Sequence, residues 1–296
     1  MSNNQRLPIV LAHGIARFDI LLEILRSKVK LPEHEFRDRF QYFKGIKTHL
    51  EAHGFEVFHP NQDFAGPVDL RAAQLRDRVN EVISNRGVDR VHIIAHSMGG
   101  LDARHMIVDL GMAENVASLT TIGTPHLGTV LADHVINHGG FLLKEGLRPV
   151  INLDGFDDLT VAACEQFNRR AEEQEARNNV FYQTYASAEA LNLVFAPLIP
   201  SWIFLRDNEG KNDGLVPFRS QQWKNELIAS DGRRKTIVQK EFPFPADHLN
   251  QVGWWDPQEA ANPVMGFLSL FKPAQIEEYE NQVKNVYSGI AQGLEE

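Results

Sequence analysis

The sequence predicts an α/β protein in which helices cover both faces of a mostly parallel central sheet. Strand-like and helix-like segments alternate over the first 130 residues, a pattern typical of parallel sheets with crossover helices. Val91, Ile93 and Ile94 also give one strand candidate the apolar, β-branched character of a strand buried on both faces. That strand leads directly into a turn at Ser97 and then into a helix-like segment.

The individual elements follow from hydrophobic periodicity and from the glycines and prolines that interrupt it. The strand candidates are short apolar runs: residues 7–12, 55–59, the run that begins at Val91, 117–122, 180–186 and 236–242. The helix candidates carry apolar residues on one face: residues 20–53, the segment with Leu75 and Val79 that Gly87 ends, the segment after Ser97 that Gly111 ends, 159–177 and 276–290. We expect a single domain over residues 1–296, because no linker-like stretch divides the chain.

Two segments depart from the regular alternation. Residues 130–165 begin with a loose pattern around Gly139, Gly140 and Gly146, and we expect a helical lid or cap there. Residues 191–205 form the most apolar stretch of the chain, but this stretch contains two prolines and is too short to span a bilayer. We therefore expect no transmembrane segment.

Composition excludes some classes of function. The chain has 43% hydrophobic and 23% charged residues, typical of a soluble globular protein. A net charge of −9 without a basic cluster argues against nucleic-acid binding. Cys164 is the only cysteine, so no disulfide can form within the chain. We see no charged-then-apolar leader before the first strand and expect a cytoplasmic protein, with non-classical secretion and the oligomeric state left open.

The turn at Ser97 has the sequence of a nucleophile elbow. Residues 95–99 fit the G-x-S-x-G pattern, with Ala95 in place of the first glycine. The sharp turn brings neighbouring chain segments close together, so the positions two before and two after the serine need small residues. Ala95 and Gly99 meet this need, and the strand–turn–helix context is the one that the motif requires.

A serine hydroxyl needs a base to take its proton, and the base needs a third group to orient it. In the α/β-hydrolase arrangement the acid and then the histidine follow the nucleophile. Of the histidines after Ser97, only His248 comes late enough to leave room for further strands and an acid loop. Asp213, in a sharp Asp-Gly turn, is the predicted acid, with Asp207 and Glu209 as alternatives. For the oxyanion hole we predict the backbone N–H groups of Met98, directly after the nucleophile, and of Ile15, in the loop after the first strand.

These segments together resemble the bacterial triacylglycerol lipases of the true-lipase family. The resemblance rests on 8–14, 95–100, 120–128, 212–216 and 247–249, in the same order along the chain. It implies an α/β-hydrolase fold with a lid, and it places the nucleophile, acid, base and oxyanion donors on the residues already chosen. Many members bind a structural calcium through a carboxylate two residues after the catalytic histidine. Here that position is Asn250, so we expect no metal and no other cofactor.

The predicted function is that of a serine carboxylic-ester hydrolase, and most specifically a lipase that cleaves acylglycerol esters through an acyl-enzyme. Phe195, Leu198 and Trp202 are candidates for the acyl pocket, with ordinary core packing as the alternative. The expected partner is a lipid or ester substrate, encountered in some cases at a lipid–water interface. Two other functions remain open: a cytosolic carboxylesterase for short soluble esters, and a binding protein without turnover.

Overall fold

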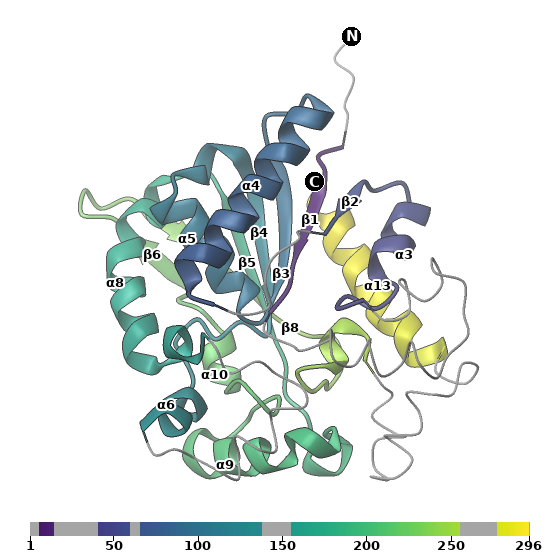
Figure 1. Ribbon diagram of the computed structural model, residues 1–296, viewed down its shortest axis with the longest axis vertical. Coiled ribbons are helices and arrows are strands. Elements are labelled where there is room, and N and C mark those ends of the chain that lie inside the picture. The colour runs from purple at the N-terminus through teal and green to yellow at the C-terminus, as the bar shows by residue number, and fades with distance from the viewer. Residues whose placement is uncertain (1–5, 15–40, 60–65, 138–154, 255–276, 296) are drawn as a thin grey trace.

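The computed structural model describes residues 6–14, 41–59, 66–137, 155–254 and 277–295. Its centre is a parallel sheet of six strands in the order β2-β1-β3-β4-β5-β8 (Figure 1). In chain order these strands are β1 (Ile9–Ala12), β2 (Val57–Phe58), β3 (Val91–His96), β4 (Val116–Ile122), β5 (Phe181–Ala186) and β8 (Val238–Glu241). The mostly parallel central sheet that the sequence predicts is confirmed.

Successive residues of the central strands face opposite sides of the sheet, and each side has its own apolar core. Ile9 and Leu11 belong to one buried cluster, whereas Val10 and Ala12 belong to the other. Ile94 and Ile93 of β3 divide in the same way. The apolar, β-branched composition of these strands therefore follows from burial on both faces.

Helices cover both faces of the sheet (Figure 1). The core on one face takes residues from α4 (Val68–Arg86), α5 (Gly99–Asp109) and α8 (Val161–Arg177). The other face is covered by α3 (Ile46–Ala52) and α13 (Glu277–Gly293), which contact each other. The same core continues to α6 (Val130–Asn137), α9 (Ile199–Glu209) and the short helix η2 (Phe156–Leu159).

The remaining described elements are short. They comprise α10 (Phe218–Gln221), the single-turn helices η1 (Met112–Asn115), η3 (Leu191–Leu193), η4 (Ala196–Leu198) and η5 (Asn250–Val252), and the antiparallel pair β6 (Glu226–Ile228) and β7 (Arg234–Thr236). Within the described ranges, no helix has the length and apolar character needed to cross a membrane.

Local signals located the element ends well. Gly87 ends α4 in the left-handed conformation, with φ of 62°, and Gly111 follows α5 with φ of 69°. The sequence did not reveal the β6–β7 hairpin. Residues 191–205, the possible acyl-pocket segment, form η3, η4 and much of α9. Residues 20–40 of the predicted helical region 20–53 lie outside the described residues. Residues 138–154, the middle of the predicted lid 130–165, also lie outside them.

Candidate active site

Ser97 occupies a strained turn between β3 and α5. Of the described non-glycine residues it alone has a positive φ, 57°, a conformation that costs free energy unless the surroundings hold it. Two hydrogen bonds from the neighbouring strand and its loop hold this turn. The Ser97 N–H donates to the Ile122 carbonyl at 2.9 Å, and the Thr124 hydroxyl donates to the Ser97 carbonyl at 2.7 Å.

The small residues of the motif are required by close approach of the backbone. A Cβ added at Gly99 would lie 2.6 Å from the carbonyl oxygen of His13 and 2.7 Å from that of Ala12. Both distances are far below contact, so no larger residue fits without moving the end of β1. Ala95 is fully buried on the other side of the nucleophile. The steric reasoning that identified the elbow in the sequence is thus met by the structure.

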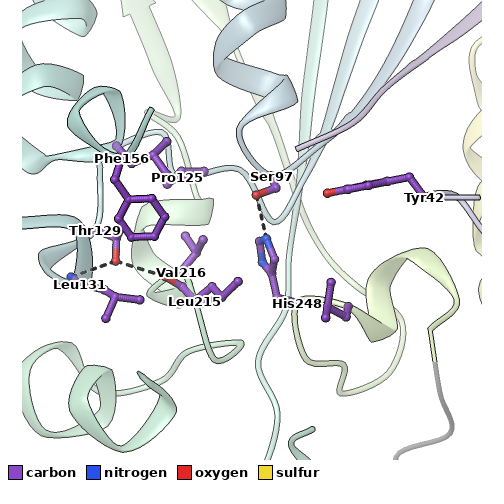
Figure 2. Close-up of a pocket in the computed structure, with 11 residues that line it drawn as sticks. Tyr42, Ser97, Pro125, Thr129, Leu131, Phe156, Leu215, Val216 and His248 are labelled. Atoms are coloured by element: carbon purple, nitrogen blue, oxygen red, sulfur yellow. Dashed lines mark hydrogen bonds between the residues drawn. The ribbon is translucent and has the colours of Figure 1, made fainter. Parts of the chain in front are cut away.

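The structure brings Ser97, His248 and Asp213 into one line of hydrogen bonds. Ser97 Oγ lies 2.8 Å from His248 Nε2 (Figure 2). On the other side of the ring, His248 Nδ1 lies 2.7 Å from Asp213 Oδ2. A carboxylate only accepts hydrogen bonds, so Nδ1 carries the imidazole proton and Nε2 presents its lone pair to the serine hydroxyl. All three residues are buried. This is the arrangement needed to remove a proton from Ser97.

A tight loop holds the Asp213 carboxylate. Oδ1 accepts the backbone N–H groups of Leu215 at 3.0 Å and Val216 at 2.7 Å, and Gly214 has φ of 97°. The alternatives named from the sequence point elsewhere, since Asp207 pairs with Arg206 and Glu209 pairs with Arg219. The loop that carries Asp213 follows α9 in the chain and not a strand of the sheet.

Met98 is well placed for an oxyanion hole. It directly precedes α5, whose first backbone N–H groups have no acceptor inside the helix. Ile15, the second predicted donor, lies outside the described residues. Gly14, just before it, packs against the nucleophile, since a Cβ there would lie 2.6 Å from Ser97 Cβ and 2.9 Å from Ser97 Oγ.

An apolar pocket opens beside Ser97 and His248. Figure 2 shows Phe156, Leu131, Leu215 and Val216 on one side of the Ser97–His248 pair and Tyr42 on the other. Pro125, Thr129, Leu159 and Leu249 complete the lining. Phe156 and Leu131 come from the two described ends of the predicted lid segment, and Leu215 and Val216 follow the acid directly.

The three residues predicted to line an acyl site lie elsewhere. Leu198 is fully buried and packs against the position of Gly214, beneath the acid loop. Phe195 is buried in the same core, and the Trp202 indole donates to the Glu189 carbonyl at 2.9 Å. None of the three lines the described pocket. Their observed packing matches the alternative that the sequence left open.

Three polar residues that the sequence did not indicate lie next to the triad. Tyr42 lines the pocket, His96 lies beside His248 with ring centroids 4.6 Å apart, and Gln251 donates to Asp213 Oδ2 at 3.0 Å. His96 stands directly before the nucleophile, and this position was the only local signal. Nothing in the sequence near Tyr42 or Gln251 indicates a site.

Hydrogen bonds between protein groups hold the loop after His248. The Asn250 amide donates to the Trp254 carbonyl at 2.9 Å and accepts the Asp247 N–H at 3.2 Å. Asp247 in turn accepts the N–H groups of Leu249 and Asn250. Within the part of the chain that the structure describes, no group of three or more His, Cys, Asp or Glu residues could hold a metal. The absence of a calcium requirement remains a prediction.

The sheet, the strained elbow and the Ser–His–Asp line together define a serine ester hydrolase of the α/β-hydrolase type. Residues 2–227 match the family described as "Putative serine esterase (DUF676)". This match extends over most of the chain, and the chain belongs to this family.

Proteins of similar sequence and structure are named lipases. Triacylglycerol lipase 2 of Saccharomyces cerevisiae is 27% identical over 283 residues, which cover 83% of this chain and 80% of the yeast protein. The triacylglycerol lipase of Pseudarthrobacter phenanthrenivorans is 36% identical over 134 residues, 44% of this chain and 36% of that lipase. The mature Bacillus licheniformis lipase BlEst2 has the same fold, with a TM-score of 0.61 at 16% identity over 90% of this chain and 91% of that chain. The resemblance to triacylglycerol lipases is confirmed by the sequence relatives.

Proposed function

We propose that the protein hydrolyses acylglycerol esters, with Ser97 as nucleophile, His248 as general base and Asp213 as its orienting acid. The observation that carries this proposal is the line from Ser97 Oγ to His248 Nε2 and from Nδ1 to Asp213 Oδ2, next to an apolar pocket. His248 takes the hydroxyl proton as Ser97 attacks the ester carbonyl, and returns it to the leaving alcohol. The acyl-enzyme is then hydrolysed by water, which His248 activates in the same way.

The backbone N–H groups of Met98 and Ile15 would hold the negative oxygen of the tetrahedral intermediate. Met98 supports this role by its place at the start of α5, where free N–H groups and the helix dipole favour an anion. The Ile15 assignment rests on the sequence and on Gly14, which fits against the nucleophile only because it has no side chain.

The acyl chain would occupy the pocket beside the triad. The lining contains Leu131, Phe156, Leu159, Leu215 and Val216, which suit a hydrocarbon chain and offer it few polar partners. The triacylglycerol lipases among the relatives favour an acylglycerol as the substrate. This assignment replaces the pocket inferred from residues 191–205.

Segment 130–165 would act as a lid over this pocket, and its ends would meet lipid. Its described ends supply three of the lining residues, Leu131, Phe156 and Leu159. The same ends carry large exposed apolar side chains, Ile136 at 38% and Val161 at 37% of their full accessible surface. Exposed apolar groups beside a substrate pocket favour contact with a lipid–water interface.

The test is hydrolysis of p-nitrophenyl esters from acetate to palmitate, with Ser97→Ala as the inactive variant and exposed Ser230→Ala as its matched control. We expect activity on long chains that disappears only in Ser97→Ala. Activity confined to acetate and butyrate, without a rise above the solubility limit of the ester, would favour a carboxylesterase for short soluble esters. Activity that survives in Ser97→Ala would refute the nucleophile.

A pair of matched variants tests the pocket assignment. Phe156→Leu shortens a side chain that lines the pocket, whereas Phe195→Leu makes the same change in the core beneath the acid loop. We expect the chain-length preference to move in Phe156→Leu and to stay in Phe195→Leu. The opposite result would restore the assignment made from the sequence.

A further inference from the structure

A chain of buried polar side chains leads from Tyr42 to the catalytic acid. The Tyr42 hydroxyl lies 2.6 Å from His96 Nδ1, and His96 Nε2 lies 3.0 Å from Gln251 Oε1. The amide nitrogen of Gln251 lies 3.0 Å from Asp213 Oδ2. Oδ2 is the same oxygen that accepts His248 Nδ1–H. Gln251 therefore shares an acceptor atom with the catalytic base.

The carboxylate fixes the direction of every bond in this chain. Asp213 can only accept, so the Gln251 NH₂ group faces it and Oε1 faces His96. His96 must then donate from Nε2, which leaves a lone pair on Nδ1 for the Tyr42 hydroxyl. Burial and the neighbouring His248 hold the pKa of His96 well below its usual range, so its ring stays neutral, and burial keeps Tyr42 protonated by raising its pKa. One arrangement of protons thus satisfies all members.

The absence of a side chain at Gly123 leaves room for Gln251. A Cβ added at Gly123, where φ is 60°, would lie 2.2 Å from Gln251 Oε1. Gln251 is also held by its backbone, because its carbonyl accepts the Tyr287 hydroxyl at 3.1 Å. At the other end, the Gly14 N–H bonds to the Tyr42 hydroxyl, one residue before the predicted oxyanion donor. The hydrogen-bonded side chains therefore connect Gly14, in the loop after β1, to Asp213, in the loop after α9.

We propose that Tyr42, His96 and Gln251 are positioning residues that act through Asp213 to fix the orientation and proton affinity of His248. This inference rests on the proposed function. Gln251 withdraws part of the Asp213 charge from the imidazole by donating to the shared oxygen. Tyr42 keeps His96 in the tautomer that presents a donor to Gln251, and thereby keeps the Gln251 amide turned toward Asp213.

The other groups around His248 are few and defined. Ser97 faces it from the elbow, Asp213 from the loop after α9, and His96 from the end of β3. Asp247, next in the chain, directs its carboxylate to backbone N–H groups, including that of Phe195 at 2.8 Å. Altering Gln251 therefore reaches His248 through the shared Asp213 oxygen and through the adjoining His96 ring, to which Gln251 also bonds.

The test measures kcat/KM for p-nitrophenyl butyrate against pH, since its acidic limb reports the base of the free enzyme. Gln251→Leu and Gln251→Met both remove the donor, and Met keeps the length of the side chain. Both changes leave more negative charge facing His248. We expect the acidic limb to move to higher pH by about 1 unit in both variants, the size of one hydrogen bond to a charged group. We expect kcat at neutral pH to fall in both, with KM little changed.

Tyr42→Phe tests the remote end of the chain. In the wild-type background it should move the acidic limb to higher pH by a smaller amount. In the Gln251→Leu background it should not move the limb, because the hydrogen bond from Gln251 to Asp213 is already missing. The matched control is Tyr182→Phe, in which a buried tyrosine loses a hydroxyl that accepts from the Asn178 amide, far from the site. This control should lose stability without moving the limb.

Fluorophosphonate labelling of Ser97 distinguishes a failure of the proposed function from a failure of the positioning role. A wild-type protein that neither labels nor turns over ester would overturn the proposed function and the positioning role with it. An active wild type whose acidic limb stays in place in folded Gln251→Leu and Gln251→Met would overturn the positioning role alone. Equal Tyr42→Phe shifts with and without Gln251 would overturn the coupling through His96.

Discussion

Asp213→Asn is the sharpest test of the catalytic line, because the surroundings of Asp213 decide how an amide would sit. Oδ1 accepts two backbone N–H groups, from Leu215 and Val216, and neither group can act as an acceptor. The two groups that donate to Oδ2, from His248 and Gln251, can each turn an acceptor toward an amide, whereas backbone N–H groups cannot, so the Asn oxygen must take the Oδ1 position. The NH₂ group then replaces Oδ2 and faces His248 Nδ1, which donates in the wild-type protein.

This orientation forces His248 into the wrong tautomer. To accept from the new amide, Nδ1 must lose its proton, and Nε2 then carries a proton toward Ser97 instead of a lone pair. The imidazolium formed in the transition state also loses its buried counter-charge, which costs about 3–5 kcal/mol when one partner of such a pair is removed. That free energy corresponds to a loss of roughly 10² to 10⁴ in rate, and the tautomer places the expected effect at the upper end.

The assay is kcat/KM for p-nitrophenyl butyrate with unfolding measured in parallel. Asp207→Asn is the matched control, since Asp207 is exposed on α9 and pairs with Arg206 at the surface. We expect wild-type activity in this control and a loss of about 10⁴ in Asp213→Asn. Retention of more than about a tenth of the activity in folded Asp213→Asn would refute Asp213 as the orienting acid.

Three further predictions follow from the described residues. Gly14→Ala should lower kcat/KM by about 10²-fold or more, because the added Cβ displaces Ser97. The control is Gly289→Ala, where the added Cβ meets open space and activity should stay unchanged. Equal activity in the two variants would contradict the close approach of Gly14 to Ser97. Dialysis against a chelator should change neither activity nor unfolding temperature, because the Asn250 amide is uncharged and bonds to the Trp254 carbonyl and the Asp247 N–H. A loss restored by calcium would contradict this prediction. Burial, and to a smaller extent the charge of Arg90, lowers the pKa of His92 from 6.5 to about 4. Between these two pH values the unfolded chain binds more protons than the folded protein, so stability is lost as the pH falls through this range. In His92→Gln, the free energy of unfolding should decrease less steeply as the pH falls through that range, with a slope smaller by about one proton. An unchanged slope would speak against this reasoning.

The sequence by itself determined the sheet, the elbow and the order of the catalytic groups. These features depend on local sterics or on chain order. Ala95 and Gly99 mark the elbow because the turn admits only small residues around Ser97, and His248 is the sole late histidine after it. Their effects are visible within a few neighbouring residues or in the order of motifs, so no knowledge of packing is needed.

Only the tertiary structure decided which side chains surround that line. Leu131, Phe156 and Leu215 of the pocket lining come from α6, η2 and the loop that carries Asp213. The apolar stretch that looked like an acyl site is packed beneath that loop instead. Composition cannot separate these roles, because an apolar residue in a pocket and one in a core have the same hydrophobicity.

The chain from Tyr42 to Asp213 shows the same limit most clearly. Tyr42 and His96 are 54 positions apart, and His96 and Gln251 are 155 positions apart. Contacts over such separations arise when strand β3, the acid loop and the loop after His248 converge at one end of the sheet. Hydrogen-bond partners that far apart leave no periodicity or spacing in the sequence, because their geometry is set by the packing of the elements that carry them.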